Sequence, residues 1–277
     1  MERPEARRRL IVNADDFGRS RCINQAVIQA HREGILTTAS LMVNEEASGE
    51  AVALAKANPS LGVGLHLTLL CGHSTLPQDK IPDLVNAQRE FTDSPVAAGL
   101  RYFLRRKIHA QLRDEIEAQF EKFRATGLKL DHVNGHLHLH LHPTIFSLLM
   151  ENSAVWGITH LRLTCDPFWF NTRLAKGHWL YRASHAAIHR VLSARARPIL
   201  REKGIKHTSV VFGLLQNARM DEDYIARLLP VLPAGDSELY SHPSLNEFKN
   251  ELDALISPRV KRLVEEQRIQ LIRYQDL

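Results

Sequence analysis

The stretch LIVNADD, residues 10–16, joins an apolar run to a polar end, and runs of this kind recur along the chain. Strands of this length, separated by helical patterns, indicate a mostly parallel sheet whose faces are covered. About eight such units over 277 residues favour an α/β fold built as a single (β/α) barrel. The other β-rich runs are TASLMV from residue 38, GVGLHLTL from 62, LDHVNGH from 130, HLRLT from 160, HTSVVFG from 207, ELYSH from 238 and IQLIRY from 269.

Helical patterns lie between most of the expected strands. Residues 23–34 end in a glycine typical of a helix C-cap, and residues 110–127 place apolar side chains at helical spacing before another glycine. The segment 165–206 is too long for a plain connection. We therefore expect one domain over residues 1–277, with an insertion or lid at 165–206 on the substrate side.

Composition and charge argue against a nucleic-acid-binding protein and against a secreted one. The net charge of +5 is spread over 36 basic and 31 acidic residues, so it predicts only a mild attraction to anions and no nucleic-acid partner. Two locally basic stretches, residues 101–107 and 189–203, could contact phosphates or a membrane surface, or form solvated helix faces. Three unpaired cysteines and no signal-peptide core predict a cytoplasmic protein, with peripheral contact at the inner face of a membrane and a homodimer left open.

Polar side chains follow the ends of several expected strands. Ligands bind at the carboxyl ends of the strands in parallel α/β folds, so residues placed there are candidates for one common rim. The candidates are Asp15, Asp16, His66, His136, Arg162 and His242.

The adjacent carboxylates of Asp15 and Asp16 stand at the end of the first expected strand. Neighbouring side chains of a strand point to opposite faces, but a bend at the strand end lets both face one cleft. Paired carboxylates favour a bound cation or a hydrogen-bonded division of roles, whereas a turn with an Asp cap is the structural alternative. The following Phe-Gly suggests a kinase motif, but too few residues precede it to form a nucleotide-binding lobe.

Residues 132–143, HVNGHLHLHLHP, contain five histidines. In a strand, four alternating imidazoles would share a face; in a helix, only His136 and His140 would stay together. Pro143 is well placed at the first position of a helix, so we expect the chain to leave the strand near Gly135. His66, in an apolar strand, is either a hydrogen-bonded core residue or a ligand. Two histidines and one carboxylate would suit Zn²⁺ or a similar divalent ion.

Four motifs in this order, LIVNADDFG, GLHLTL, the histidine run from 132 to 140 and YSHP from 240, resemble the YdjC/ChbG-like carbohydrate deacetylase family over nearly the whole chain. The resemblance is closest to its hopanoid-biosynthesis (HpnK) branch. It implies a TIM-like, distorted barrel of the glycoside hydrolase/deacetylase type and one divalent metal ion, with Zn, Mn, Co and, less readily, Mg as candidates. The implied substrate is an N-acetylated amino sugar, namely a hopanoid-linked N-acetylglucosamine.

The resemblance also implies roles for single residues. The metal ligands would be Asp16, His66 and His136, the base Asp15 and the acid His242. Many family members have Asp-Ser where this chain has Asn134 and Gly135, which would alter the surroundings of the metal and mark a branch with a different substrate.

Roles for the remaining candidates stay open. His138 and His140 would support the ligands or contact substrate, and Arg162 would bind the sugar or form an ion pair. The aromatic residues 168–170 would stack on a sugar, receive a lipid tail or pack within the lid. His73, His109, His160, His185 and His189 are expected to be surface or structural residues.

Three other functions use similar residues. One is deacetylation of soluble chito-oligosaccharides, and another is hydrolysis of a phosphoester or cyclic amide by a barrel metal hydrolase. The third is non-catalytic binding of metal or sugar.

Overall fold

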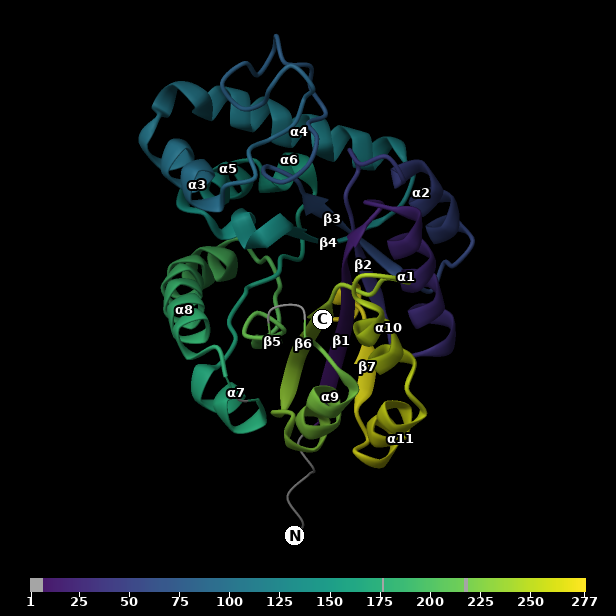
Figure 1. Ribbon diagram of the computed structural model, residues 1–277. Helices are drawn as coiled ribbons and strands as arrows, with labels where there is room; N and C mark the ends of the chain where they lie inside the picture. The colour runs from purple at the N-terminus through teal and green to yellow at the C-terminus, as the bar shows by residue number, and fades with distance from the viewer. Residues whose placement is uncertain (1–6, 176, 217–218) are drawn as a thin grey trace.

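A curved parallel sheet forms the centre of the computed structural model, which describes residues 7–175, 177–216 and 219–277 (Figure 1). Its strands lie in the order β4-β3-β2-β1-β6-β5, and β7 pairs with the beginning of β1. Every pairing between these seven strands is parallel, so the fold class predicted from the sequence is confirmed. The strands are β1 (Arg8–Phe17), β2 (Thr38–Leu41), β3 (Gly62–Leu67), β4 (Leu130–Gly135), β5 (Val210–Phe212), β6 (Gly235–Ser241) and β7 (Gln270–Ile272).

The gap between β4 and β5 is bridged by the segment from residue 160 to 164, which the sequence predicted to be a strand. This segment is not a regular strand, but its backbone bonds on both sides. The N–H of Arg162 donates to the carbonyl of Val133 on β4 at 3.0 Å, and the N–H of Val211 on β5 donates to the carbonyl of Cys165, the residue after this segment, at 3.1 Å. The barrel therefore closes through isolated bridges, and the described residues form seven regular strands instead of about eight.

Helices cover the outside of the sheet (Figure 1). The predicted insertion forms two of them, α7 and α8, apart from residue 176, which lies outside the described residues. None of the described helices is both long and apolar enough to cross a bilayer. The helices are α1 (Arg21–Glu33), α2 (Ser48–Lys56), α3 (Pro95–Leu104), α4 (His109–Ala125), α5 (Pro143–Glu151), α6 (Ser153–Trp156), α7 (Phe168–Leu174), α8 (Trp179–Glu202), α9 (Glu222–Leu228), α10 (Lys249–Ile256) and α11 (Pro258–Glu266), with 3₁₀ turns η1 (Arg106–Ile108), η2 (His136–Leu141), η3 (Leu229–Val231) and η4 (Tyr274–Asp276).

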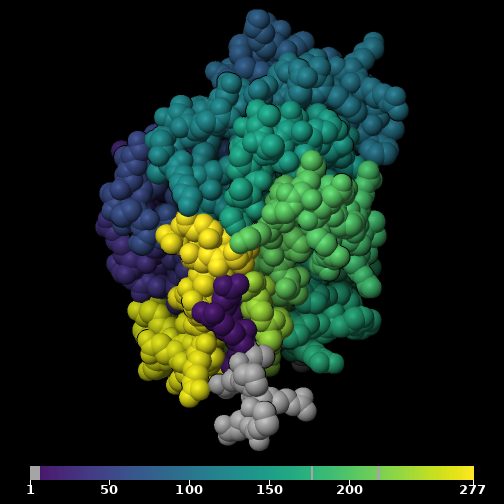
Figure 2. Space-filling model, turned by 180° about the vertical axis from the view of Figure 1, so that it is seen from behind, coloured from purple at the N-terminus to yellow at the C-terminus, as the bar shows by residue number. Residues whose placement is uncertain are grey.

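The inside of the barrel is polar, unlike the apolar layer between sheet and helices. A Cβ atom at Gly64 would lie 2.5 Å from the ring of His132, so glycine is needed for this imidazole to occupy the interior. The fully buried Tyr274 stacks on the same ring, with 4.4 Å between the two ring centroids. From behind, the C-terminal segment (yellow) lies against the beginning of β1 (purple) (Figure 2). The buried polar residues inside include Asn13, Ser40, His132, Asn134, Arg162 and Glu238.

Candidate active site

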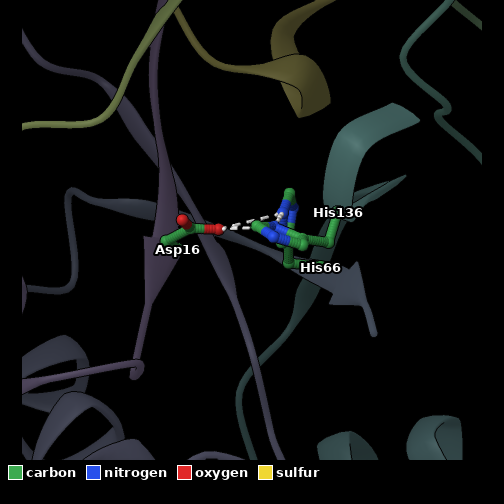
Figure 3. A group of neighbouring side chains, drawn as sticks. All are labelled: Asp16, His66 and His136. Carbon is green, nitrogen blue, oxygen red and sulfur yellow. Dashed lines mark hydrogen bonds and ion pairs between the residues drawn. The ribbon is translucent and has the colours of Figure 1, made fainter. Parts of the chain in front are cut away.

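Three strand ends bring one carboxylate and two imidazoles together (Figure 3). Asp16 Oδ1 lies 3.0 Å from His136 Nδ1 and 3.3 Å from His66 Nε2, and the two nitrogens are 3.4 Å apart. Ligand atoms of a tetrahedral zinc site, each about 2.0–2.2 Å from the ion, are separated by about 3.3–3.6 Å. The three residues therefore fit a divalent ion with a coordination position left for water or substrate.

The backbone bends where these ligands are placed. Asp16 has a φ of 63°, in the left-handed region, and the pairing of β1 with β2 shifts register between Ala14 and Phe17. This strained bend turns Asp15 and Asp16 toward two neighbouring parts of the interior. On β4 the chain leaves the strand at Gly135, as predicted, and Pro143 begins α5. The histidine run is thus divided among β4, η2 and the start of α5.

Asp16 and His66 each favour the charged form of the other. Burial opposes ionisation of Asp16, but His136 and His66 hold the pKa of its carboxyl well below the usual range. Burial also disfavours a charged His66, yet Asp15 and Asp16 raise the pKa of its imidazole overall. The carboxylate therefore stays ionised and available to a cation.

Asn134 connects the candidate metal ligand His66 to Asp15. Its Nδ2 donates to Asp15 Oδ1 at 3.0 Å and to Ser40 Oγ at 2.9 Å. A carboxylate can only accept, so the amide oxygen must face His66, whose Nδ1 donates to it at 2.7 Å. In the neutral imidazole this assignment leaves His66 Nε2 unprotonated, so that its lone pair and Asp16 Oδ1 could bind one cation. Asn134, noted in the sequence only as a departure from the family, thus sets the tautomer of a ligand.

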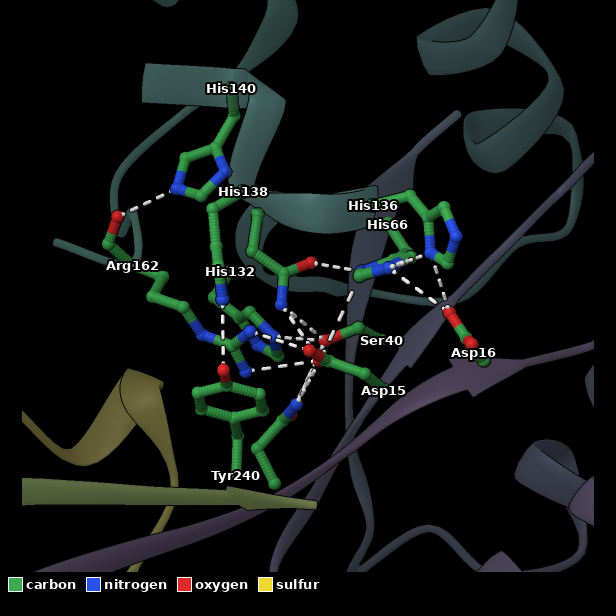
Figure 4. A network of polar contacts seen from close by, with 12 residues as sticks. Asp15, Asp16, Ser40, His66, His132, His136, His138, His140, Arg162 and Tyr240 are labelled. Carbon is green, nitrogen blue, oxygen red and sulfur yellow. Dashed lines mark hydrogen bonds and ion pairs between the residues drawn. The ribbon is translucent and has the colours of Figure 1, made fainter. Parts of the chain in front are cut away.

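Asp15 lies behind the candidate metal ligands, and Arg162 binds both of its carboxylate oxygens (Figure 4). Arg162 donates from Nη1 to Oδ2 at 2.6 Å and from Nη2 to Oδ1 at 3.0 Å. The same guanidinium pairs with Glu238 at 2.7 Å and lies over the ring of Tyr240. Burial opposes ionisation of Asp15, but Arg162, His66 and His242 together outweigh it and hold the pKa of the carboxyl well below its usual range. Of the two roles open to Arg162, the structure contains the ion pair.

His138 and His140 occupy different environments. His138 borders the cavity, with Nε2 2.9 Å from Tyr240 Oη, and burial lowers the pKa of its imidazole well below the usual range. His140 is fully buried and donates from Nε2 to the carbonyl of Arg162 at 2.9 Å. Burial lowers the pKa of His140 to about 3, so this ring is neutral. The position of His140 suits support of the backbone, whereas His138 can reach a substrate.

His242 directly follows β6 and faces the cavity. Its side chain is 27% exposed, and Nδ1 lies 3.9 Å from Glu251 Oε2. The same carboxylate accepts from the backbone N–H of His242 at 2.5 Å. Glu251, a buried residue of α10 that the sequence interpretation missed, therefore anchors the loop that carries this imidazole.

A cavity of about 570 Å³ opens over these residues. Its opposite wall is formed by Tyr181, His185 and His189 of α8, with the rings of Tyr181 and His185 stacked at 3.8 Å. The insertion thus contributes to the site, but His185 and His189 border the cavity, in contrast to the expected surface or structural role. Their spacing of four residues, which puts all three on one helix face, was the available signal.

Comparison with known proteins adds to this geometry. A family profile described as YdjC-like protein matches residues 9–266. A carbohydrate deacetylase of Brevibacillus brevis is 43% identical over 146 residues, covering 52% of this chain and 54% of that protein. A chitooligosaccharide deacetylase of Proteus mirabilis is 36% identical over 146 residues, covering 51% and 54%. The chain spans about half the length of these curated relatives.

A solved structure resembles the whole fold. It is a protein of Enterococcus faecalis with a proposed role in cellobiose-phosphate cleavage, matched with a TM-score of 0.74 over 98% of this chain and 99% of that one. At 20% identity, this likeness supports the fold alone. The family profile extends from the beginning of β1 to the end of α11. The chain therefore belongs to the YdjC-like protein family.

Proposed function

We propose that this protein removes the acetyl group from an N-acetylated amino sugar by metal-assisted hydrolysis. The observation that carries the proposal is the set Asp16, His66 and His136, whose ligand atoms lie within 3.4 Å of one another beside a substrate-sized cavity. The deacetylase names of the relatives point to the same reaction. A divalent ion held there would polarise the acetamide carbonyl and make a water molecule more acidic.

Asp15 and His242 are the proposed base and acid. Both border the cavity with the metal ligands. Asp15 would accept the proton of the attacking water, and His242 would protonate the departing amine, which leaves poorly as an anion. The contact with Arg162 keeps Asp15 ionised but makes it a weak proton acceptor. The proposed role of Asp15 must therefore be tested separately from metal binding.

The proposed substrate is a hopanoid-linked N-acetylglucosamine, and the proposed place of the reaction is the cytoplasm. Leu137 and Leu180 support this substrate, because these apolar side chains are 53% and 89% exposed beside the cavity-lining residues. Soluble chito-oligosaccharides are the second candidate substrate, favoured by the name of the Proteus mirabilis relative. The closeness to the hopanoid branch and a homodimer both stay predictions.

The test is mass spectrometry of both substrate types after incubation with metal-loaded protein. We expect loss of one acetyl group and release of acetate. Reaction of free chito-oligosaccharides alone would overturn the lipid-linked substrate but leave deacetylation intact, whereas hydrolysis of only phosphoesters or lactams would overturn deacetylation.

A single substitution separates catalysis from binding. Asp15→Asn is expected to abolish turnover while the protein retains its metal, because the amide cannot accept a proton. Full turnover in this variant would contradict the role of Asp15. A protein that binds metal and sugar but hydrolyses none of the compounds would fit the non-catalytic alternative.

A further inference from the structure

Helix α3 exposes an apolar face to solvent. Four side chains on it are between 57% and 72% exposed: Val96, Leu100, Phe103 and Leu104. Their spacing of four, seven and eight residues places them on one stripe. The opposite face is already packed, since Tyr102 is fully buried and donates to the carbonyl of Leu69. The exposed apolar stripe is therefore not needed to pack α3 against the rest of the protein.

Helix α8 repeats this arrangement. Leu180, Ile188 and Val191 are 89%, 55% and 69% exposed, and their spacing of eight and eleven residues again forms one stripe. On another side of the same helix, Tyr181 and His185 line the cavity. Contiguous exposed apolar side chains of this kind mark interaction surfaces more often than isolated ones do.

Both helices border the mouth of the cavity. Pro95 at the start of α3, Leu137 of η2 and Tyr181 of α8 all line it. Figure 1 shows α3 and α8 on the same side of the molecule. The exposed stripes therefore flank the entrance through which a substrate must pass.

The positive charge of the chain is concentrated in the same two segments. Residues 94–113 and 167–201 contain twelve Lys and Arg but no Asp or Glu. The remaining 24 Lys and Arg are outnumbered by 31 Asp and Glu, so the rest of the chain is acidic. Arg105, Arg106 and Arg190 are exposed examples next to the apolar stripes. The modest net charge of +5 conceals this separation.

We propose that α3 and α8 dock the mouth of the cavity onto an anionic lipid bilayer. Exposed apolar side chains on basic helices insert at the boundary between headgroups and acyl chains, while Lys and Arg bind the lipid phosphates. A second copy of this chain would bind the α3–α8 surface less well than a bilayer does. The two copies would each present a basic face without acidic residues, and these faces would repel each other. The proposal does not depend on the proposed deacetylase function.

Vesicle co-sedimentation of the full chain tests the proposal. Phosphatidylcholine vesicles are compared with vesicles that also contain phosphatidylglycerol. We expect binding to the mixed vesicles and at least tenfold less to the neutral ones, with the difference reduced by high salt. Absence of binding to the mixed vesicles at low salt would overturn the proposal.

Two variants at the mouth of the cavity and one control variant locate the surface. Leu100→Asp with Leu104→Asp on α3, and Leu180→Asp on α8, should each weaken binding at least tenfold. The matched control is Val231→Asp, an exposed position on η3, away from the cavity, where binding should not change. Unchanged binding in both mouth variants would contradict the proposal.

Two further measurements separate membrane docking from misfolding and from self-association. Unaltered thermal unfolding of the variants would show that lost binding is not lost folding. Sedimentation velocity without vesicles should give the same species for all variants; a dimer that the mouth substitutions disperse would assign the surface to a second copy and overturn the proposal.

Discussion

On one side of the cavity the metal-ligand candidates project from the ends of β1, β3 and β4, whereas on the other Tyr181, His185 and His189 project from the single helix α8. The strand-end side is held by a second layer of buried partners, such as Asn134 behind His66. On the helix side, Nδ1 of His185 bonds within its own helix and Nδ1 of His189 has no protein partner. Such a difference suits fixed chemistry on one wall and adaptable substrate contacts on the other.

The largest expected effect is loss of metal binding on the strand-end side. Loss of a residue that only supports a metal ligand lowers metal affinity by up to roughly a hundredfold. Asp16→Ala or His136→Ala removes a candidate ligand itself and should therefore lower the affinity, measured by calorimetry, by more than this. His142→Ala is the matched control, since this imidazole bonds to the carbonyl of Gly99 instead. Equal losses in His136→Ala and His142→Ala would contradict the assignment of ligands.

The ion pair behind the ligands should dominate stability. Arg162→Met leaves Asp15 and Glu238 buried without their partner and should cost about 3–5 kcal/mol of unfolding free energy in urea denaturation at neutral pH. In the wild type, the lowered pKa of Asp15 contributes stability that is present above about pH 4 and is lost as the pH falls further.

An exposed arginine provides the control for this substitution. Arg113→Met removes a surface pair with Asp114, which should change the unfolding free energy by less than about 0.5 kcal/mol. Similar costs for the two arginines would show that the buried network is not what stabilises the barrel.

Substitutions of Asn134 test whether the buried partner of His66 controls metal affinity. Asn134→Leu removes the acceptor for His66 and should lower metal affinity by about 10–100-fold. Asn134→Asp keeps an acceptor for His66 but places a second carboxylate beside Asp15. It should therefore retain more metal affinity than the Leu variant while losing unfolding free energy, and the reverse order would refute the assigned amide orientation.

The helix wall should affect substrate binding alone. Tyr181→Ala is expected to raise KM about fivefold, the equivalent of about 1 kcal/mol of ring stacking, with metal affinity unchanged. Ile188→Ala, on the outward side of α8, should leave KM for a soluble sugar unaltered. A change in metal affinity for Tyr181→Ala would mean that the two walls are coupled.

The smallest effect concerns the pH dependence of the insertion. Burial raises the pKa of Asp166 to about 7, although backbone N–H groups of Leu215 and Gly213 oppose the shift. The folded state then binds more protons than the unfolded state between about pH 4 and 7, so stability should fall as the pH rises through this range.

Substitution isolates this contribution. Asp166→Asn cannot titrate and should flatten the profile of Tm against pH between about pH 4 and 7. Asp253→Asn, on the surface of α10, is the control and should leave the profile unchanged. An unchanged slope in Asp166→Asn would assign the pH dependence to other groups.

The sequence by itself determined the fold class and the positions of the candidate ligands. Parallel strands present their carboxyl ends at one edge, so Asp16, His66 and His136 could be assigned to one rim from local patterns alone. The break at Gly135 and the helix start at Pro143 also follow from local backbone preferences. These features depend on neighbours in the sequence, which is why reading the chain predicts them.

Only the tertiary structure decided how the charges pair and which residues form the opposite wall. Arg162 meets Asp15 across 147 residues and Glu238 across 76, and no periodicity in the sequence encodes either contact. Closure by irregular bridges instead of a regular strand likewise depends on distant backbone. Ion pairs and cavity walls of this kind form between segments that meet only when the barrel closes, so their partners are set by packing.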